Sequence, residues 1–171
     1  MHLERLLIDL GLDTRFQKRA SNQPEARPDE IAFAEHAVSL VRSGKSLGPL
    51  TAHQRAMLLS AWRSATYVYF ILSDEADVVK IGKSKRPVSR LSDLRIGSPV
   101  RLRLLFSFMA NQSTEGQIHK YLSGSRSHGE WFRLDGKVLH LMDVAADHGL
   151  KGVMWLIDFE ERGIDSPALT G

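Results

Sequence analysis

The sequence contains no cysteine among its 171 residues. This absence excludes disulfide bonds and thiolate metal sites, and it fits a protein of a reducing compartment. Long apolar runs are also missing, since no stretch approaches the roughly 20 residues that a membrane-spanning helix needs. The first segment is interrupted by Glu4, Arg5 and Asp9, which does not fit a signal peptide. We therefore expect a cytoplasmic protein that does not associate with membranes.

Acidic residues are scarce in one segment, although the chain as a whole carries a net charge of only +3. Residues 80–103 contain a single acid, Asp93, and the basic residues Lys80, Lys83, Lys85, Arg86, Arg90, Arg95, Arg101 and Arg103. This segment therefore carries +7, which leaves −4 for the remainder. Such a local basic block indicates a polyanionic partner, while a solvated basic face is the simpler alternative.

The first 64 residues have the pattern of helices. Apolar residues recur at helical spacing over 3–10 and 31–41, and residues 51–54 have the capping-box pattern that opens a helix. Residues 13–27 are polar and predict a linker.

A strand-rich pattern begins at Tyr67. The β-branched and aromatic run 67–72 and the apolar run 78–82 are separated by about five turn residues, which predicts a hairpin. The later segments predict a helix over 86–95, a strand over 100–108, a helix over 113–122, a short strand over 130–134 and a helix over 138–148 that ends at Gly149. Residues 153–159 fit a strand or a helix equally well. This order predicts an α+β core with a helical N-terminal appendage. We expect the aromatic residues of the first strand, and Trp62, to be packing residues.

Three short motifs in this region resemble the GIY-YIG endonuclease superfamily. Val68-Tyr69-Phe70 is followed, eleven residues after Tyr69, by Lys80-Ile81-Gly82-Lys83, and Arg90 lies eight residues after Gly82. Glu115, His119 and Gly129-Glu130-Trp131-Phe132 resemble the compact branch of that superfamily, first described from phage reading frames and a fungal meiotic gene. The joint order and spacing of these motifs carry the resemblance over residues 67–134. At Tyr67 the superfamily has glycine, and at Lys80 it has a tyrosine that is a candidate general base, although the compact branch often has lysine there.

The resemblance implies a small three-stranded antiparallel sheet flanked by helices. On this basis we divide the chain into a helical region over 1–64, a GIY-YIG-like nuclease domain over 65–150 and a C-terminal extension over 151–171. The catalytic residues that it implies are Tyr69, Lys80, Arg90, Glu115 and His119, and we expect their side chains to converge over one face of the sheet.

Arg90, Tyr69 and Lys80 would act on the phosphodiester. A guanidinium forms a fork that matches phosphate oxygens, so Arg90 is the expected phosphate clamp. The Tyr69 hydroxyl would hold the attacking water or the phosphate. Lys80 would be a general base if neutral or a phosphate-binding cation if charged, and we favour the cation because exposed lysine is protonated near neutral pH. Lys83, Lys85 and Arg86, together with Arg90, are the expected nucleic-acid-binding residues.

Glu115 is the expected ligand of a divalent ion, Mg²⁺ or Mn²⁺, because such ions prefer oxygen ligands and keep several waters. A carboxylate in the first turn of a helix is also favoured for structural reasons alone. His119 lies one helical turn after Glu115, where it could transfer a proton or simply pair with that carboxylate. Glu130 would support the site by closing it or by binding Arg90 or His119.

The function that these residues predict is metal-dependent endonuclease cleavage of nucleic acid, above all DNA, by a protein of phage or mobile-element origin. A catalytically silent nucleic-acid-binding module on the same scaffold is the first alternative, and a protein-interaction domain is a weaker one. Cutting both strands requires two copies or two steps, so a homodimer is one expected assembly.

Overall fold

The structure, a computed structural model, describes residues 3–12, 25–64 and 66–162. The elements in chain order are α1 (Leu3–Asp9), α2 (Pro28–Arg42), α3 (Ala52–Ser64), β1 (Thr66–Ser73), β2 (Val78–Ser84), α4 (Pro87–Ile96), β3 (Leu102–Ala110), α5 (Thr114–Tyr121), a 3-10 turn η1 (Ser123–Ser125), β4 (Arg126–His128), β5 (Trp131–Arg133) and α6 (Gly136–Glu161). The predicted α+β class is confirmed. The predicted linker over 13–27 lies mostly outside the described residues.

The sheet has five antiparallel strands in the order β3-β1-β2-β5-β4. The predicted three-stranded sheet is therefore wrong. β1, β2 and β3 match the expected strands, and β5 corresponds to the short strand expected over 130–134 and pairs with β2. The strand that the sequence did not indicate is β4, because it lies in a segment rich in glycine and serine that lacks the apolar alternation of a strand.

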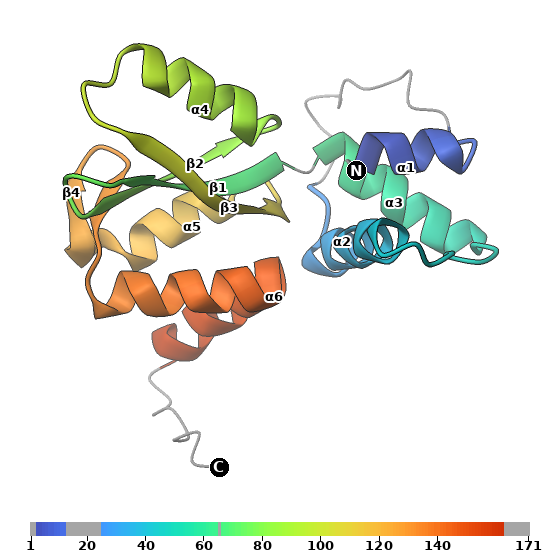
Figure 1. The fold of residues 1–171 in the computed structure, drawn as a ribbon. Coiled ribbons are helices and arrows are strands. Elements are labelled where there is room, and N and C mark those ends of the chain that lie inside the picture. Colours follow the sequence, from blue (N-terminus) through green and yellow to red (C-terminus); the bar gives the residue numbers. More distant parts are fainter. Residues whose placement is uncertain (1–2, 13–24, 65, 163–171) are drawn as a thin grey trace.

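Helices cover both faces of the sheet (Figure 1). α4 packs on one face, against β1, β2 and β3, while α5 and α6 cover the other. The N-terminal helices lie beside the sheet, where α2 contacts β3 and α6. The expected capping box of α3 is confirmed: the Thr51 hydroxyl accepts from the Gln54 amide at 3.2 Å, and the Gln54 side chain accepts from the Thr51 amide at 2.9 Å.

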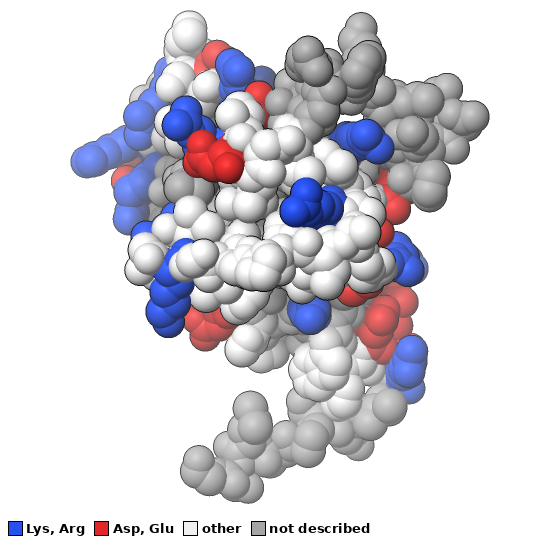
Figure 2. All heavy atoms as spheres, turned by 90° about the vertical axis from the view of Figure 1, so that its right-hand side faces the viewer, with Lys and Arg blue, Asp and Glu red and all other residues white. Residues whose placement is uncertain are grey.

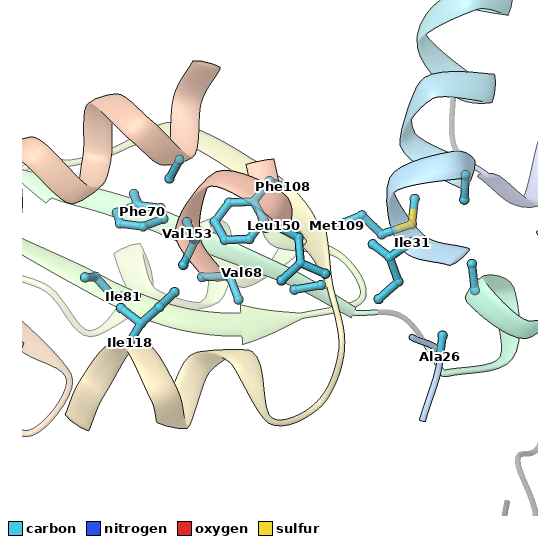
Figure 3. Packing of buried hydrophobic residues seen from close by; sticks show 14 of the residues in the cluster. Ala26, Ile31, Val68, Phe70, Ile81, Phe108, Met109, Ile118, Leu150 and Val153 are labelled. Carbon is cyan, nitrogen blue, oxygen red and sulfur yellow. The ribbon is translucent and has the colours of Figure 1, made fainter. Parts of the chain in front are cut away.

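One hydrophobic core joins the N-terminal helices to the sheet. Val68, Phe70 and Ile81 point from the strands toward α5 and α6, and Met109 reaches from the end of β3 toward Ile31 of α2 (Figure 3). A second, smaller cluster lies under α4 on the opposite face. Because apolar burial is the main stabilising term in folding, the appendage and the sheet region stabilise each other.

α6 settles the ambiguous pattern near the C-terminus, since residues 153–159 are helical. Gly149 has φ +57 and breaks the helix, as predicted, but a second helical segment follows immediately. α6 therefore passes over the predicted boundary at residue 150, and the three-part division of the chain stays a prediction. Within the described residues, no helix combines the length and apolar character that crossing a bilayer requires.

Gly82 makes room for a neighbouring aromatic ring. It pairs with Tyr69 across β1 and β2, and a Cβ on Gly82 would lie 2.4 Å from the Tyr69 hydroxyl oxygen. Tyr69 is only 1% exposed, so its ring has little freedom to move aside. The absence of a side chain at Gly82 thus allows the Tyr69 ring to lie across β2.

Glu35 connects the appendage to the edge of the sheet. Its carboxylate accepts a hydrogen bond of 2.7 Å from the Met109 amide, on a side of β3 that no strand of the described residues covers. Gly149 leaves space for this carboxylate, because a Cβ there would lie 2.9 Å from a Glu35 oxygen. Burial raises the Glu35 pKa from 4.5 to about 7, although the Met109 hydrogen bond acts in the opposite direction.

Glu35 should make stability depend on pH. Because its pKa is raised on folding, the folded chain holds a proton that the unfolded chain has released, and stability is lost as pH rises from 4.5 through about 7. Glu35→Gln removes this cost and keeps an oxygen for the Met109 amide. We expect a rise in Tm of about 3 °C at alkaline pH, which corresponds to about 1 kcal/mol for a chain of this size, and a smaller rise near pH 5. Glu75→Gln, at an exposed turn position, is the control and should show no such dependence.

Gly82→Ala should destabilise the protein by about 1–3 kcal/mol, because the added methyl group overpacks the Tyr69 ring. Gly116→Ala is the matched control, since a Cβ at Gly116 of α5 meets no atom within 4 Å. That change should stabilise the helix by about 0.5–1 kcal/mol. Denaturant melts of the two variants measure both effects, and equal stability of the two would contradict the close approach of Tyr69 to Gly82.

Candidate functional site

The candidate site surrounds the open edge of β2. β5 pairs with β2 only over Val78–Lys80. One further hydrogen bond follows, in which the Ile81 amide of β2 donates to the carbonyl of Glu130, the residue before β5, at 3.0 Å. From Gly82 onward, no described strand covers that edge of β2. Side chains from both faces of the sheet can therefore meet there.

Tyr69 and Arg90 meet on the α4 side. The Arg90 side chain lies within hydrogen-bonding range of the Tyr69 hydroxyl. Burial raises the Tyr69 pKa, although the hydrogen bond and positive charge of Arg90 act in the opposite direction. Tyr69 is therefore a neutral phenol near pH 7, able to donate or accept a hydrogen bond. The negative charges of Glu130 and Glu115 raise the pKa of this hydroxyl further.

Lys80 is buried, and its ammonium group donates a short hydrogen bond to Glu130. It also lies 5.7 Å from the centre of the Trp131 ring. The Lys80 hydrogen bond lowers the Glu130 pKa, and the charges of His119 and Arg90 add to this effect. Glu130 thus stays ionised among three basic groups, and its direct partner is Lys80 rather than the expected Arg90 or His119.

Lys83 and Glu115 form a second ion pair, on the α5 side. Their nitrogen and oxygen atoms are 3.2 Å apart, and the Lys83 ammonium also donates to the Gln112 carbonyl at 2.9 Å. The Glu115 side chain is only 14% exposed, while that of Lys83 is 38% exposed. Glu115 is therefore held by a cation that is itself partly open to solvent.

His119 is fixed against β2. Its Nε2 lies 2.8 Å from the Ile81 carbonyl, and its ring packs at 5.1 Å from that of Phe132. A carbonyl only accepts hydrogen bonds, so Nε2 carries the proton and Nδ1 is the nitrogen left to accept one. The alternative in which His119 pairs with Glu115 is not what the contacts show, because Glu115 pairs with Lys83.

The expected convergence over one face of the sheet is wrong. Arg90 comes from α4, whereas Glu115 and His119 come from α5 on the opposite face (Figure 1). The two groups nevertheless lie along the same stretch of β2, because Glu115 binds Lys83 and the partner of Arg90, Tyr69, lies across the neighbouring Gly82. Side chains alternate along β2, so Lys80 lies on the α4 side and Lys83 lies on the α5 side, where Glu115 binds it. The candidate residues are therefore divided between the two faces.

The remaining expected nucleic-acid contacts lie beyond the end of β2. Lys85 and Arg86 are exposed, and among the described residues their side chains form no ion pair or hydrogen bond. They line a cleft rather than the group around Tyr69. The basic block is therefore divided between two neighbouring surfaces.

The acidic groups fit one kind of metal site only. Across residues 3–12, 25–64 and 66–162, no three His, Asp or Glu side chains come together to hold a metal ion. A closed protein site is thus absent from these ranges. One carboxylate, that of Glu115, fits a hard ion that keeps waters and takes a substrate phosphate as a further ligand.

Sequence reasoning missed two partners in this site. Trp131 had no expected role in the site, but its ring lies beside the Lys80 ammonium. The contact of Lys83 with the Gln112 carbonyl had no sequence signal, because it joins positions 29 residues apart. The position of Glu130 directly before β5 could have indicated its approach to Lys80, since Lys80 pairs with Trp131.

The chain was compared with known protein families, curated proteins and solved structures. Residues 66–145 match the T5orf172 domain, a phage-associated domain related to GIY-YIG- and HNH-like nucleases. No curated protein and no solved structure matches the chain. The matched range starts at the first residue of β1 and ends within α6, so it contains the whole sheet and every candidate site residue named above. The chain thus contains a segment similar to a nuclease-related phage domain, and the finer assignment to the GIY-YIG superfamily stays a prediction.

Proposed function

We propose that residues 66–145 form a metal-dependent endonuclease of GIY-YIG type that hydrolyses phosphodiester bonds in nucleic acid, above all DNA. The observation that carries this proposal is that two groups lie at adjacent positions of β2: Tyr69 with Arg90 at Gly82, and Lys83 with Glu115. Phosphodiester hydrolysis requires cationic and hydrogen-bonding groups around the developing charge, which Arg90, Lys83 and Tyr69 supply, while the Glu115 carboxylate offers oxygen ligands to a metal ion. The similarity to a nuclease-related domain supports the same conclusion.

Arg90 and Tyr69 bind the scissile phosphate in this proposal. The guanidinium offers several donors, and the neutral Tyr69 phenol either donates to a phosphate oxygen or holds the attacking water. Lys80 acts as a cation, because it is paired with Glu130. The ion pair of Lys80 with Glu130 holds the Glu130 carboxylate in place.

Glu115 would hold Mg²⁺ or Mn²⁺ with water and a phosphate oxygen as the other ligands. The bound ion would offset phosphate charge. Lys83 neutralises Glu115 in the absence of other partners and is free to turn toward the phosphate because its side chain is partly exposed. His119 Nδ1 is the group available to accept a proton, since Nε2 is engaged by the Ile81 carbonyl.

A silent nucleic-acid-binding module is the second candidate, and a specific observation favours it. Glu115, the proposed metal ligand, is already paired with Lys83, and the described residues provide no group of three metal donors. In this alternative Arg90 and Lys83 bind phosphates, and Glu115 is a structural partner of Lys83. Both candidates require salt-sensitive binding, because phosphate contacts release counterions.

The cellular setting belongs to the same proposal. The chain has no cysteine, which fits the reducing cytoplasm. Cleavage of both strands would use two copies of the chain or two successive cuts at one site.

Plasmid nicking separates the two candidates. We expect the wild-type protein to nick supercoiled plasmid when Mg²⁺ or Mn²⁺ is present and not when the metal is chelated. Glu115→Gln should reduce nicking by at least about a hundredfold while plasmid binding is retained, because it removes the carboxylate charge but keeps the shape of the side chain. Arg90→Ala should weaken both nicking and binding, because the guanidinium contacts phosphate in both states.

Glu75→Gln is the matched control, since it removes the same charge from an exposed turn outside the site. It should nick like the wild type. Binding without nicking across a series of divalent metals would support the silent module and refute the endonuclease. Nicking that survives Glu115→Gln would remove this residue from the proposed mechanism.

A further inference from the structure

A cleft of about 500 Å³ separates the N-terminal helices from the start of α4. Its lining includes Trp62 of α3 and Tyr67 of β1, together with Lys85 and Arg86, which connect β2 to α4. The volume is within the usual range for small-molecule and cofactor sites. Residues from both the appendage and the sheet region are needed to form it.

The aromatic residues of the cleft can accept a flat ring. Trp62 and Tyr67 are both only partly buried, although both pack against the core. They therefore keep some aromatic surface toward the cleft. Bases bind to such surfaces by stacking, and this is tolerant of sequence because every base has an aromatic face.

The cleft also has a basic part of its lining. Lys85 and Arg86 are exposed and, among the described residues, their side chains have no ion-pair or hydrogen-bonding partner. Glu4 of α1 is the acid that lines the same cleft, so the two cations exceed it by one charge. Figure 2 looks onto the side formed by the N-terminal helices, where uncharged side chains predominate and charged ones are scattered. The two adjacent cations, together with the aromatic residues, favour an anionic occupant that has an apolar, flat part.

The cleft lies next to the candidate site along β2. Gly82 is at the centre of that site, and Lys85 follows it by three residues, which is about 10 Å along an extended chain. Successive nucleotides of one DNA strand advance by about 3.4 Å along the helix axis, so this distance corresponds to about three nucleotides. A strand bound at Arg90 can therefore continue into the cleft.

We propose that this cleft binds one unpaired nucleotide of the nucleic-acid substrate, about three positions from the phosphate held at Arg90. The base stacks on Trp62 and Tyr67, and Lys85 and Arg86 bind the adjoining phosphates. A paired base is stacked inside the duplex and does not reach the cleft, so the preferred substrate carries a single-stranded extension or an extruded base. This inference rests on the proposed function, because it takes nucleic acid to be the substrate.

Equilibrium binding in the absence of divalent metal tests the inference. The probes are a blunt DNA duplex, the same duplex with a single-stranded extension at its 3′ or 5′ end, and the same extensions built from abasic nucleotides. The wild-type protein should bind one of the base-bearing extensions about tenfold more tightly than the blunt duplex, as expected for one stacked base. The abasic extension should lose most of that gain.

Two variants locate the effect. Lys85→Glu combined with Arg86→Glu should abolish the preference for the extended duplex, and so should Trp62→Leu, which keeps an apolar side chain but removes the ring. Lys151→Glu is the charge control, because Lys151 is exposed on α6, on the face of the sheet away from α4. It should retain the preference. Thermal melts of each variant check folding, and the double charge variant, which changes exposed side chains only, tests the cleft if Trp62→Leu unfolds.

The same preparations are assayed for plasmid nicking, so the two proposals can fail separately. Equal binding of blunt, extended and abasic probes would overturn the cleft inference, even if nicking is present. A preference that survives in the double charge variant would overturn it as well. A preference that depends on the base and the cleft, without nicking, would support the cleft and contradict the endonuclease.

Discussion

The contact on which the candidate site depends is the passage of the Tyr69 ring across Gly82. A side chain at position 82 would occupy the place of the Tyr69 hydroxyl, so glycine is the residue that allows this approach. The ring directs its hydroxyl toward Arg90 at the edge where β2 loses its strand partner. Arg90 reaches this hydroxyl from one face, while on the other face Glu115 binds Lys83, the residue next to Gly82, so both groups lie at the same point of β2.

Around that hydroxyl, the charges are arranged as pairs. Lys80 is paired with Glu130, and Lys83 is paired with Glu115. Leaving a buried charge unpaired is costly, so these pairs keep a cation-rich edge compatible with a stable fold. The two pairs differ in exposure: the Lys80 side chain is enclosed, while that of Lys83 is partly open to solvent. Lys80 is therefore suited to fixing the site, whereas Lys83 keeps access to solvent and to a further partner.

The N-terminal helices belong to the same folded body as the sheet. They share one apolar core with it, and Glu35 bonds to the edge strand through the Met109 amide. The cleft beside α4 exists only because α1 and α3 are held against the sheet. A loss of the Glu35 contact would therefore affect the shape of the cleft before it affected the hydroxyl of Tyr69, which is surrounded by residues of the sheet region. The appendage is in this way connected to the cleft rather than to the hydroxyl of Tyr69.

The sequence by itself determined the local structure, since the helices and the first hairpin follow from apolar spacing, capping residues and turn residues. The order of the short motifs also indicated the candidate site residues. Only the tertiary structure decided that β4 completes a five-stranded sheet, that Arg90 and Glu115 approach from opposite faces, and which carboxylate binds each lysine. The physical reason is range. Helix periodicity and turn preferences act within a few residues, whereas the Lys80–Glu130 pair joins positions 50 residues apart, and such a pairing depends on how the whole sheet is assembled.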